Sequence, residues 1–122
     1  HAPNSLSEVV AELIRLQLRK GKVSMERAAR SLDMGPRKLR REMDREGTTF
    51  RECTKRVRTI TAKELLVETD LAFSTISTDL GYANPSLFTR AFARDVGQTP
   101  SNFRATGTRK HKLGRPENLA GQ

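Results

Sequence analysis

One pattern of helices and turns occurs twice in this chain, and this internal repeat limits its possible folds more than any other feature. Each copy has a short helix, a tight turn, a second helix and a glycine break. In the second copy, Gly81 is suited to end the first helix, Asn84 is a good N-cap, and Pro85 falls at the first position of the next helix. A short helix joined to another by a glycine-containing turn is typical of a helix-turn-helix unit. The sequence therefore predicts two such units.

The two copies align when the turn of the second is allowed one extra residue. The equivalent segments are Ala28-Ala29-x-x-Leu32 with Ile76-Ser77-x-x-Leu80, Met34 with Tyr82, Leu39-Arg40-Arg41-x-Met43 with Phe88-Thr89-Arg90-x-Phe92, and Gly47 with Gly97. Arg41 and Arg90 therefore occupy equivalent positions. Helical spacing in the second copy predicts four inward-facing side chains, Leu87, Phe88, Ala91 and Phe92.

The repeat divides the chain into five segments. We expect residues 1–5 to be a tag remnant or linker, 6–47 the first helix-turn-helix subdomain, 48–68 a linker helix, and 69–105 the second subdomain. Residues 106–122 combine glycine with many charges and little periodicity, which predicts a basic flexible tail. Ser5 and Glu8 have the spacing of a capping box at the start of the first helix. The linker helix has an approximate apolar stripe, formed by Phe50, Cys53, Val57, Ile60 and Leu65.

Composition narrows the class of partner. Twenty-three Lys and Arg against 14 Asp and Glu give a net charge of +9, which favours a polyanion partner over a merely solvated basic surface. Few strand formers alternate, so the fold should be all-α. One cysteine, Cys53, and two histidines exclude an internal disulfide and a zinc module, and we expect no metal and no cofactor. No apolar run approaches the roughly 20 residues of a membrane span, which favours a cytoplasmic protein without membrane contact.

The second copy also resembles a known family. The Leu80-Gly81-Tyr82 turn, the Phe88-x-Arg90-x-Phe92 core and the ending Gly97-x-Thr99-Pro100-Ser101-x-Phe103-Arg104 are similar to the signature of AraC/XylS-type transcription regulators. The resemblance covers roughly residues 4–105. It implies about seven helices, a homeodomain-like fold of two helix-turn-helix units, and binding of a double-stranded DNA operator by two recognition helices in successive major grooves. It also implies an N-terminal effector or dimerisation domain outside this chain, with RNA polymerase as a further partner.

Two departures from the family pattern concern stability. Ser77 replaces a small apolar residue at a tight helix contact, and Gly35 replaces the usual Ser or Thr cap before the first recognition helix. A third concerns recognition, because Pro85 and Ser86 stand where other members have polar base-reading residues. The second unit is therefore expected to read less sequence directly.

The resemblance and the chemistry of arginine identify candidate contacts. The base-contact candidates are Arg37, Arg40, Arg41, Ser86, Thr89 and Arg90, and the phosphate-contact candidates are Lys38, Arg45 and Arg94. Arg pairs bidentately with guanine O6 and N7, so the arginines of the first unit are suited to guanine-containing steps. The simpler alternatives are phosphate contact only, or pairing with Glu42 or Asp44 in the first unit and with Asp95 or Asp79 in the second.

Three functional interpretations stay open from the sequence. The first is sequence-specific DNA binding as the reader domain of a transcription regulator. The second is a nonspecific, nucleoid-type or RNA-binding protein that uses only its charge. The third is a DNA-binding module attached to an enzyme, such as the regulatory half of an alkylation-repair protein. The chain itself has no paired carboxylates, nucleophile–base spacing or phosphate-binding glycine loop, so we do not expect it to be an enzyme.

Overall fold

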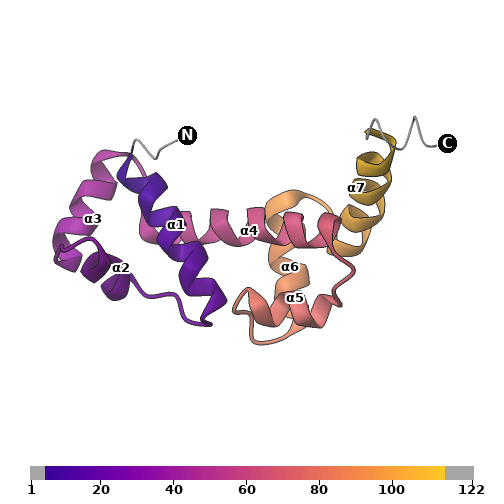
Figure 1. Cartoon of the computed structure of the whole chain (residues 1–122), viewed down its shortest axis with the longest axis horizontal. Helices are drawn as coiled ribbons and strands as arrows, with labels where there is room; N and C mark the ends of the chain where they lie inside the picture. The colour runs from indigo at the N-terminus through magenta and orange to yellow at the C-terminus, as the bar shows by residue number, and fades with distance from the viewer. Residues whose placement is uncertain (1–4, 115–122) are drawn as a thin grey trace. The chain divides into compact units, whose positions relative to one another are not determined.

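The computed structural model describes the backbone of residues 5–114 and the side chains of residues 5–107, and all regular structure within that range is helical (Figure 1). The helices of the described range are α1 Leu6–Arg19, α2 Met25–Ser31, α3 Pro36–Arg45, α4 Phe50–Glu68, α5 Phe73–Asp79, α6 Pro85–Val96 and α7 Pro100–Gly114. The all-α prediction is therefore confirmed, with seven helices in that part of the chain.

Two compact units make up the chain, and the boundary between them lies inside α4, between Arg58 and Thr59. The helix predicted as a separate linker is therefore shared: its first half completes one unit and its second half the other. The single apolar stripe predicted along it is wrong at Ile60, which is 40% exposed. The buried positions change from Cys53 and Val57 to Ala62 and Leu66, a step that breaks the three- and four-residue spacing of one stripe.

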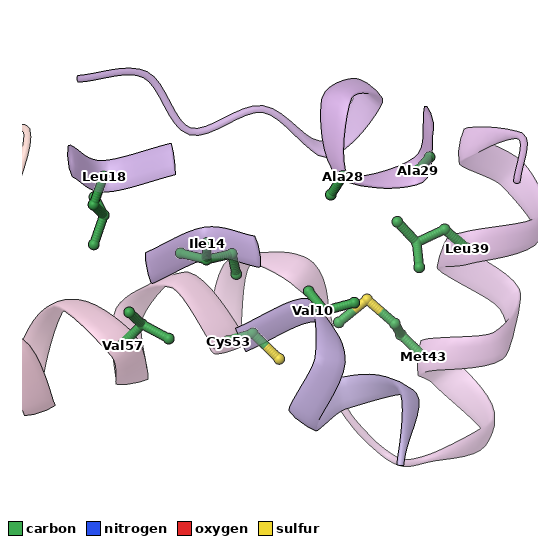
Figure 2. Close-up of a cluster of buried hydrophobic side chains, with 9 residues drawn as sticks. All are labelled: Val10, Ile14, Leu18, Ala28, Ala29, Leu39, Met43, Cys53 and Val57. Atoms are coloured by element: carbon green, nitrogen blue, oxygen red, sulfur yellow. The ribbon is translucent and has the colours of Figure 1, made fainter. Parts of the chain in front are cut away.

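The first unit has a core of aliphatic and sulfur-containing side chains (Figure 2). Val10, Ile14 and Leu18 recur every four residues along α1, so they line the face of that helix that is buried. The other buried members come from three helices: Ala28 and Ala29 of α2, Leu39 and Met43 of α3, and Cys53 and Val57 of α4. Cys53 is thus a small core residue, as its place in the sequence predicts.

The start of α1 is held by polar side chains. Ser5 and Glu8 form the predicted capping box, in which the Glu8 main-chain N–H donates to Ser5 Oγ (3.2 Å) and the Ser5 N–H donates to Glu8 Oε1 (3.2 Å). A second acidic residue also acts here, because the carboxylate of Glu46 accepts from the N–H groups of Leu6 (3.0 Å) and Ser7 (2.9 Å). Glu46 follows α3, so it ties the loop after that helix to the positive end of α1.

These hydrogen bonds lower the pKa of Glu46. The main-chain N–H of Ser7 is the largest cause, followed by the Ser7 hydroxyl and the N–H of Leu6. Donors that favour the ionised carboxylate stabilise it relative to the acid.

The second unit has a core that contains a chain of aromatic rings. Neighbouring ring centroids are 5.7 Å apart for Tyr82 and Phe88, 5.8 Å for Phe88 and Phe92, and 5.5 Å for Phe92 and Phe103. The latter two pairs meet edge to face, an arrangement that the aromatic quadrupole favours. The buried residues around these rings are Ala62 and Leu66 of α4, Ile76 of α5, and Leu80, which directly follows α5.

Arg104 on α7 closes the C-terminal end of α4. Its Nε donates to the carbonyl of Leu66 (2.9 Å) and its Nη2 to the carbonyl of Thr69 (3.2 Å). Its guanidinium also lies 5.0 Å from the centroid of the Phe73 ring at the start of α5. A cation that satisfies the last carbonyls of a helix, and interacts with an aromatic ring, holds three helices of this unit together.

The flexible tail predicted from residue 106 is wrong for residues 106–114, because α7 continues to Gly114. Gly107 is one of the glycines on which the prediction of a flexible tail rested, but it permits close packing: a Cβ at this position would lie 2.7 Å from Cγ2 of Val67. The absence of a side chain lets α7 pass close to α4. The predicted terminal segments 1–4 and 115–122 lie outside the described residues.

Candidate nucleic-acid interface

The two predicted turns form the same hydrogen bonds, which gives the repeat a structural basis. In the first unit, the N–H of Asp33 donates to the carbonyl of Arg30 (3.0 Å) and that of Met34 to Ala29 (2.8 Å). In the second unit, the N–H of Gly81 donates to Thr78 (3.0 Å) and that of Tyr82 to Ser77 (3.0 Å). In both hydrogen bonds, the donor and the acceptor of the first unit occupy positions that the alignment makes equivalent to those of the second unit.

Both turns need a residue in the left-handed region at the same place. Gly81 has φ +86°, and its counterpart Asp33 has φ +57°. Glycine adopts this conformation without a Cβ clash, whereas aspartate pays a steric cost that its short polar side chain only reduces. The first turn is therefore the more strained of the two.

In the first unit, the turn presents α3 with a dense cationic surface. Leu39 and Met43 are buried, which fixes the rotation of the helix about its axis. The remaining face carries four exposed cations that form no hydrogen bond or ion pair with any described residue: Arg37, Lys38, Arg40 and Arg41. These include all three base-contact candidates of this unit. The alternative that they pair with Glu42 or Asp44 is not what the structure contains.

Arg45, the remaining cation of α3, differs from these four. Its Nη1 lies 3.3 Å from Oε2 of Glu42, one turn earlier on the same helix. The pair is solvent-exposed on the Arg45 side, so it contributes little to stability and can be exchanged for a phosphate contact at small cost. Arg45 remains a candidate, but with a carboxylate partner that the other cations lack.

The helix after the turn in the second unit, α6, begins at the predicted cap. Asn84 Oδ1 accepts from the N–H of Leu87 (3.0 Å), and Pro85 follows at the first helical position. By contrast, α3 begins at Gly35, which provides no side-chain cap. Phe88 and Phe92 are buried and play the part of Leu39 and Met43.

The candidates on α6 fall into three environments. Ser86 and Arg90 are exposed, Thr89 is half-buried, and Arg94 is exposed but paired with its neighbour. The Nε of Arg94 donates to Oδ1 of Asp95 (3.1 Å), so the acidic partner considered for Arg90 is taken by Arg94. Arg90 forms no ion pair with Asp95, Asp79 or any other described residue. It is the one unpaired cation among the described side chains of α6.

Leu87 corrects the sequence interpretation. It was expected to face inward with Phe88, Ala91 and Phe92, yet 41% of it is exposed. The signal was present in the spacing, because Phe88 and Phe92 define the buried stripe and Leu87 lies about 100° around the helix from Phe88. The first turn of α6 therefore presents Ser86, Leu87 and, one turn on, Arg90.

Other kinds of site find no support in the described part of the chain. No group of three or more metal-binding side chains occurs there, and no described helix is long and apolar enough to cross a membrane. Neither histidine has a described side chain, since His1 and His111 lie outside that range.

Two helix-turn-helix units, each with at least one unpaired cation exposed in the first two turns of its second helix, define a DNA-binding domain of the double helix-turn-helix class. A family model described as a helix-turn-helix domain matches residues 28–106. The chain belongs to this family, in its AraC type, and is the DNA-binding domain of a transcriptional regulator.

Individual relatives agree with this assignment. The HTH-type transcriptional regulator VirS of Mycobacterium tuberculosis is 38% identical over 103 residues, which cover 84% of this chain and 30% of VirS. The ornithine utilization regulator of Pseudomonas aeruginosa is 38% identical over 80 residues, covering 66% of this chain and 24% of that protein. The chain thus spans less than a third of these relatives. By name, both relatives are regulators, and VirS is an HTH-type transcriptional regulator.

Among solved structures, the DNA-binding domain of AdpA, crystallised in complex with a target DNA, matches with a TM-score of 0.70. It shares 19% sequence identity, and the match covers 91% of this chain and all of that one. At this identity the match supports the fold.

Proposed function

We propose that this domain binds double-stranded DNA sequence-specifically, with α3 and α6 entering successive segments of the major groove. The observation that carries the proposal is the duplicated turn: the same two hydrogen bonds recur in each unit, ahead of a helix that exposes unpaired charge, four cations on α3 and Arg90 on α6. A protein that binds only through net charge needs neither the repeated turn nor the fixed helix rotation that the buried pairs impose.

The two helices have different proposed roles. Arg37, Arg40 and Arg41 of α3 are the readers of guanine O6 and N7, and Lys38 contacts phosphate. On α6, Ser86, Thr89 and Arg90 are the base-contact candidates, while Arg45 and Arg94 leave their carboxylate partners to contact phosphate. The exposed polar surface of α6 is smaller than that of α3, so we expect fewer hydrogen bonds to bases in the second half of the site.

The length of α4 fits this arrangement. Nineteen helical residues span about 28 Å, somewhat less than the roughly 34 Å between major-groove segments on one face of DNA. A continuous helix that contributes to both cores is a suitable connector between two readers.

For the intact regulator, we propose an additional N-terminal domain for effector binding or dimerisation, and contact with RNA polymerase. The support is that this chain matches 30% of the length of VirS. The reading frame of the intact gene tests the proposed N-terminal domain. A stop codon in frame shortly before His1, without an intervening start, would contradict it.

The experiment for DNA binding is selection of bound duplexes from a randomised pool at about 150 mM salt, where surface charges alone are largely screened. The expected result is enrichment of two short blocks whose centres lie about one helical turn apart. Equal recovery of all sequences, with binding that disappears as salt rises, would contradict sequence-specific reading.

A further inference from the structure

The surfaces of the two recognition helices differ in one chemical respect beyond charge. The exposed side chains of α3 in its first two turns are proline and four cations. The first turn of α6 instead exposes a large apolar side chain, Leu87, at its third position. Leu87 lies three residues before Arg90 and Ser86 lies four before it, so both are neighbours of Arg90 on the helix surface.

The core of the second unit does not use Leu87. Phe88 and Phe92 occupy the inward positions of α6 and are 1% and 3% exposed, so turning Leu87 inward would displace a packed ring. Other exposed apolar side chains lie elsewhere: Leu16 on α1, Ile60 on α4 and Leu71 between α4 and α5. Leu87 is the one among them that lies on a predicted recognition helix.

The major groove offers one apolar group to such a side chain. Guanine, cytosine and adenine present hydrogen-bond donors and acceptors there, whereas thymine also presents its 5-methyl group. Residues in the first turn of a recognition helix are those that contact base edges. A leucine in this position can bury a thymine methyl but cannot satisfy the polar groups of the other bases.

We propose that Leu87 is a specificity residue that reads the 5-methyl group of thymine in the second half of the site. This inference rests on the proposed entry of α6 into the major groove. It predicts a division of recognition, in which the first block contains guanines read by arginines and the second contains at least one thymine read by apolar contact.

The test uses the duplex selected by the wild-type domain. Each thymine of the second block is replaced in turn by deoxyuridine, which removes the methyl group and keeps the base pair. At one or two positions, the wild-type affinity should fall about fourfold, as expected for one buried carbon. Thymines of the first block, replaced in the same way, serve as an internal comparison.

Two variants assign the effect to a side chain. Leu87→Ala should bind the thymine duplex more weakly and should no longer distinguish thymine from uracil at the sensitive position. Leu16→Ala truncates a leucine that is more exposed, at 55%, and lies outside the recognition helices. It should retain the wild-type preference. Thermal melting of each variant verifies that it is folded before binding is compared.

The outcomes separate this inference from the proposed function. If two blocks are selected but no uracil in the second lowers wild-type affinity, methyl reading is wrong and the bipartite reader stands. If Leu87→Ala keeps the thymine preference, another side chain contacts the methyl group and the inference is again wrong. If selection recovers no preferred sequence, both fail together.

Discussion

The two helix-turn-helix units share a backbone plan but differ in the quality of their local structure. The second unit has glycine at the left-handed turn position and an asparagine cap before its recognition helix. The first has Asp33 in the left-handed region and Gly35 as an uncapped start. The first unit carries more binding chemistry, with four unpaired cations on α3 against Arg90 alone among the described side chains of α6. The second unit, with the unstrained turn and the capped helix, thus exposes fewer unpaired cations than the first.

The two cores also differ, in the type of side chain that fills them. The first packs aliphatic and sulfur-containing side chains, and the second packs a chain of four aromatic rings. In the second unit, Arg104 also holds helices together through the carbonyl of Leu66. Equivalent positions in a repeat can therefore diverge widely in side-chain type while the hydrogen bonds of the turn stay the same. Backbone geometry is what the repeat conserves within this chain.

The largest expected difference between the units is in their contribution to DNA affinity. Replacing Arg37, Lys38, Arg40 and Arg41 together by glutamine should lower affinity about a thousandfold or more, because three base contacts at about 1–3 kcal/mol each and one phosphate contact are lost. Arg90→Gln removes one proposed base contact and should lower affinity about fivefold to a hundredfold. The dependence of log K on log salt concentration should become less steep by about 1 in the first variant, through Lys38, and change little in the second. Titrations at several salt concentrations measure both, and equal losses of affinity would remove the proposed asymmetry.

The next effect concerns the brace that only the second unit has. Arg104→Ala should lower the free energy of unfolding by about 2 kcal/mol, because the last carbonyls of α4 lose two charge-assisted donors. Arg104→Lys should recover only part of this, since an ammonium cannot reproduce the planar donor geometry. Arg94→Ala removes an exposed arginine pair and is the matched control, expected to change stability by less than about 0.5 kcal/mol. Chemical denaturation measures all three variants.

The equivalent turn positions 33 and 81 allow the effect of a left-handed residue with a side chain to be compared between the two units. Gly81→Ala should cost about 1–2 kcal/mol, because it forces a Cβ into the left-handed region. Asp33→Gly should be neutral or stabilise by up to about 1 kcal/mol, since it relieves the same strain in the first unit. Thermal unfolding compares them. A loss of stability on Asp33→Gly would show that the aspartate side chain contributes more than its strain costs.

A buried hydroxyl offers a second exchange at equivalent positions. Ser77 is fully buried and its Oγ has no hydrogen-bond partner among the described residues, whereas its counterpart in the first unit is Ala29. Ser77→Ala should therefore stabilise the second unit by about 1 kcal/mol, and Ala29→Ser should destabilise the first by about 1–3 kcal/mol. Denaturant midpoints measure both. Destabilisation by Ser77→Ala would mean that the hydroxyl has a partner.

The smallest effect is a dependence of the first unit on pH. The pKa of Glu46 is lowered in the folded state, so its stabilising contribution is present above its ordinary value near 4.5 and is lost as pH falls through the lowered value. Glu46→Gln should therefore be less stable than the wild type at neutral pH, and the difference should shrink in acid. Denaturation at neutral and acidic pH measures this, and a constant difference would contradict it.

Local features of this chain are predictable from sequence, and features that depend on contacts between distant segments are not. The caps at Ser5 and Asn84 and the turn at Gly81 were predicted, because each is decided by a few neighbouring residues. The exposure of Leu87 depends on which of two adjacent apolar residues the core accepts, and the sequence prediction placed both inside although only Phe88 keeps a four-residue spacing with Phe92.

The same reason explains the errors at the end of the chain and in α4. In the sequence, Gly107 suggests the end of regular structure, and only the structure shows that it packs against Val67. The role of Arg104 depends on carbonyls about 35 residues away, at Leu66 and Thr69. Ile60 looks like a stripe member unless the change from one core to the other within α4 is known. Among the candidate contacts, the sequence prediction already placed Arg45 and Arg94 in the phosphate-contact group, but which carboxylates pair with them is known only from the structure.

The most direct test of the bipartite reader is to change the spacing between the two selected blocks. Inserting about five base pairs moves the second block to the opposite face of the duplex, about half a helical turn away. Because α4 is one continuous helix that contributes to both cores, the account predicts that affinity falls to that of a duplex with only the first block. Unchanged affinity would contradict it, because the two units would then not read one face of the DNA together.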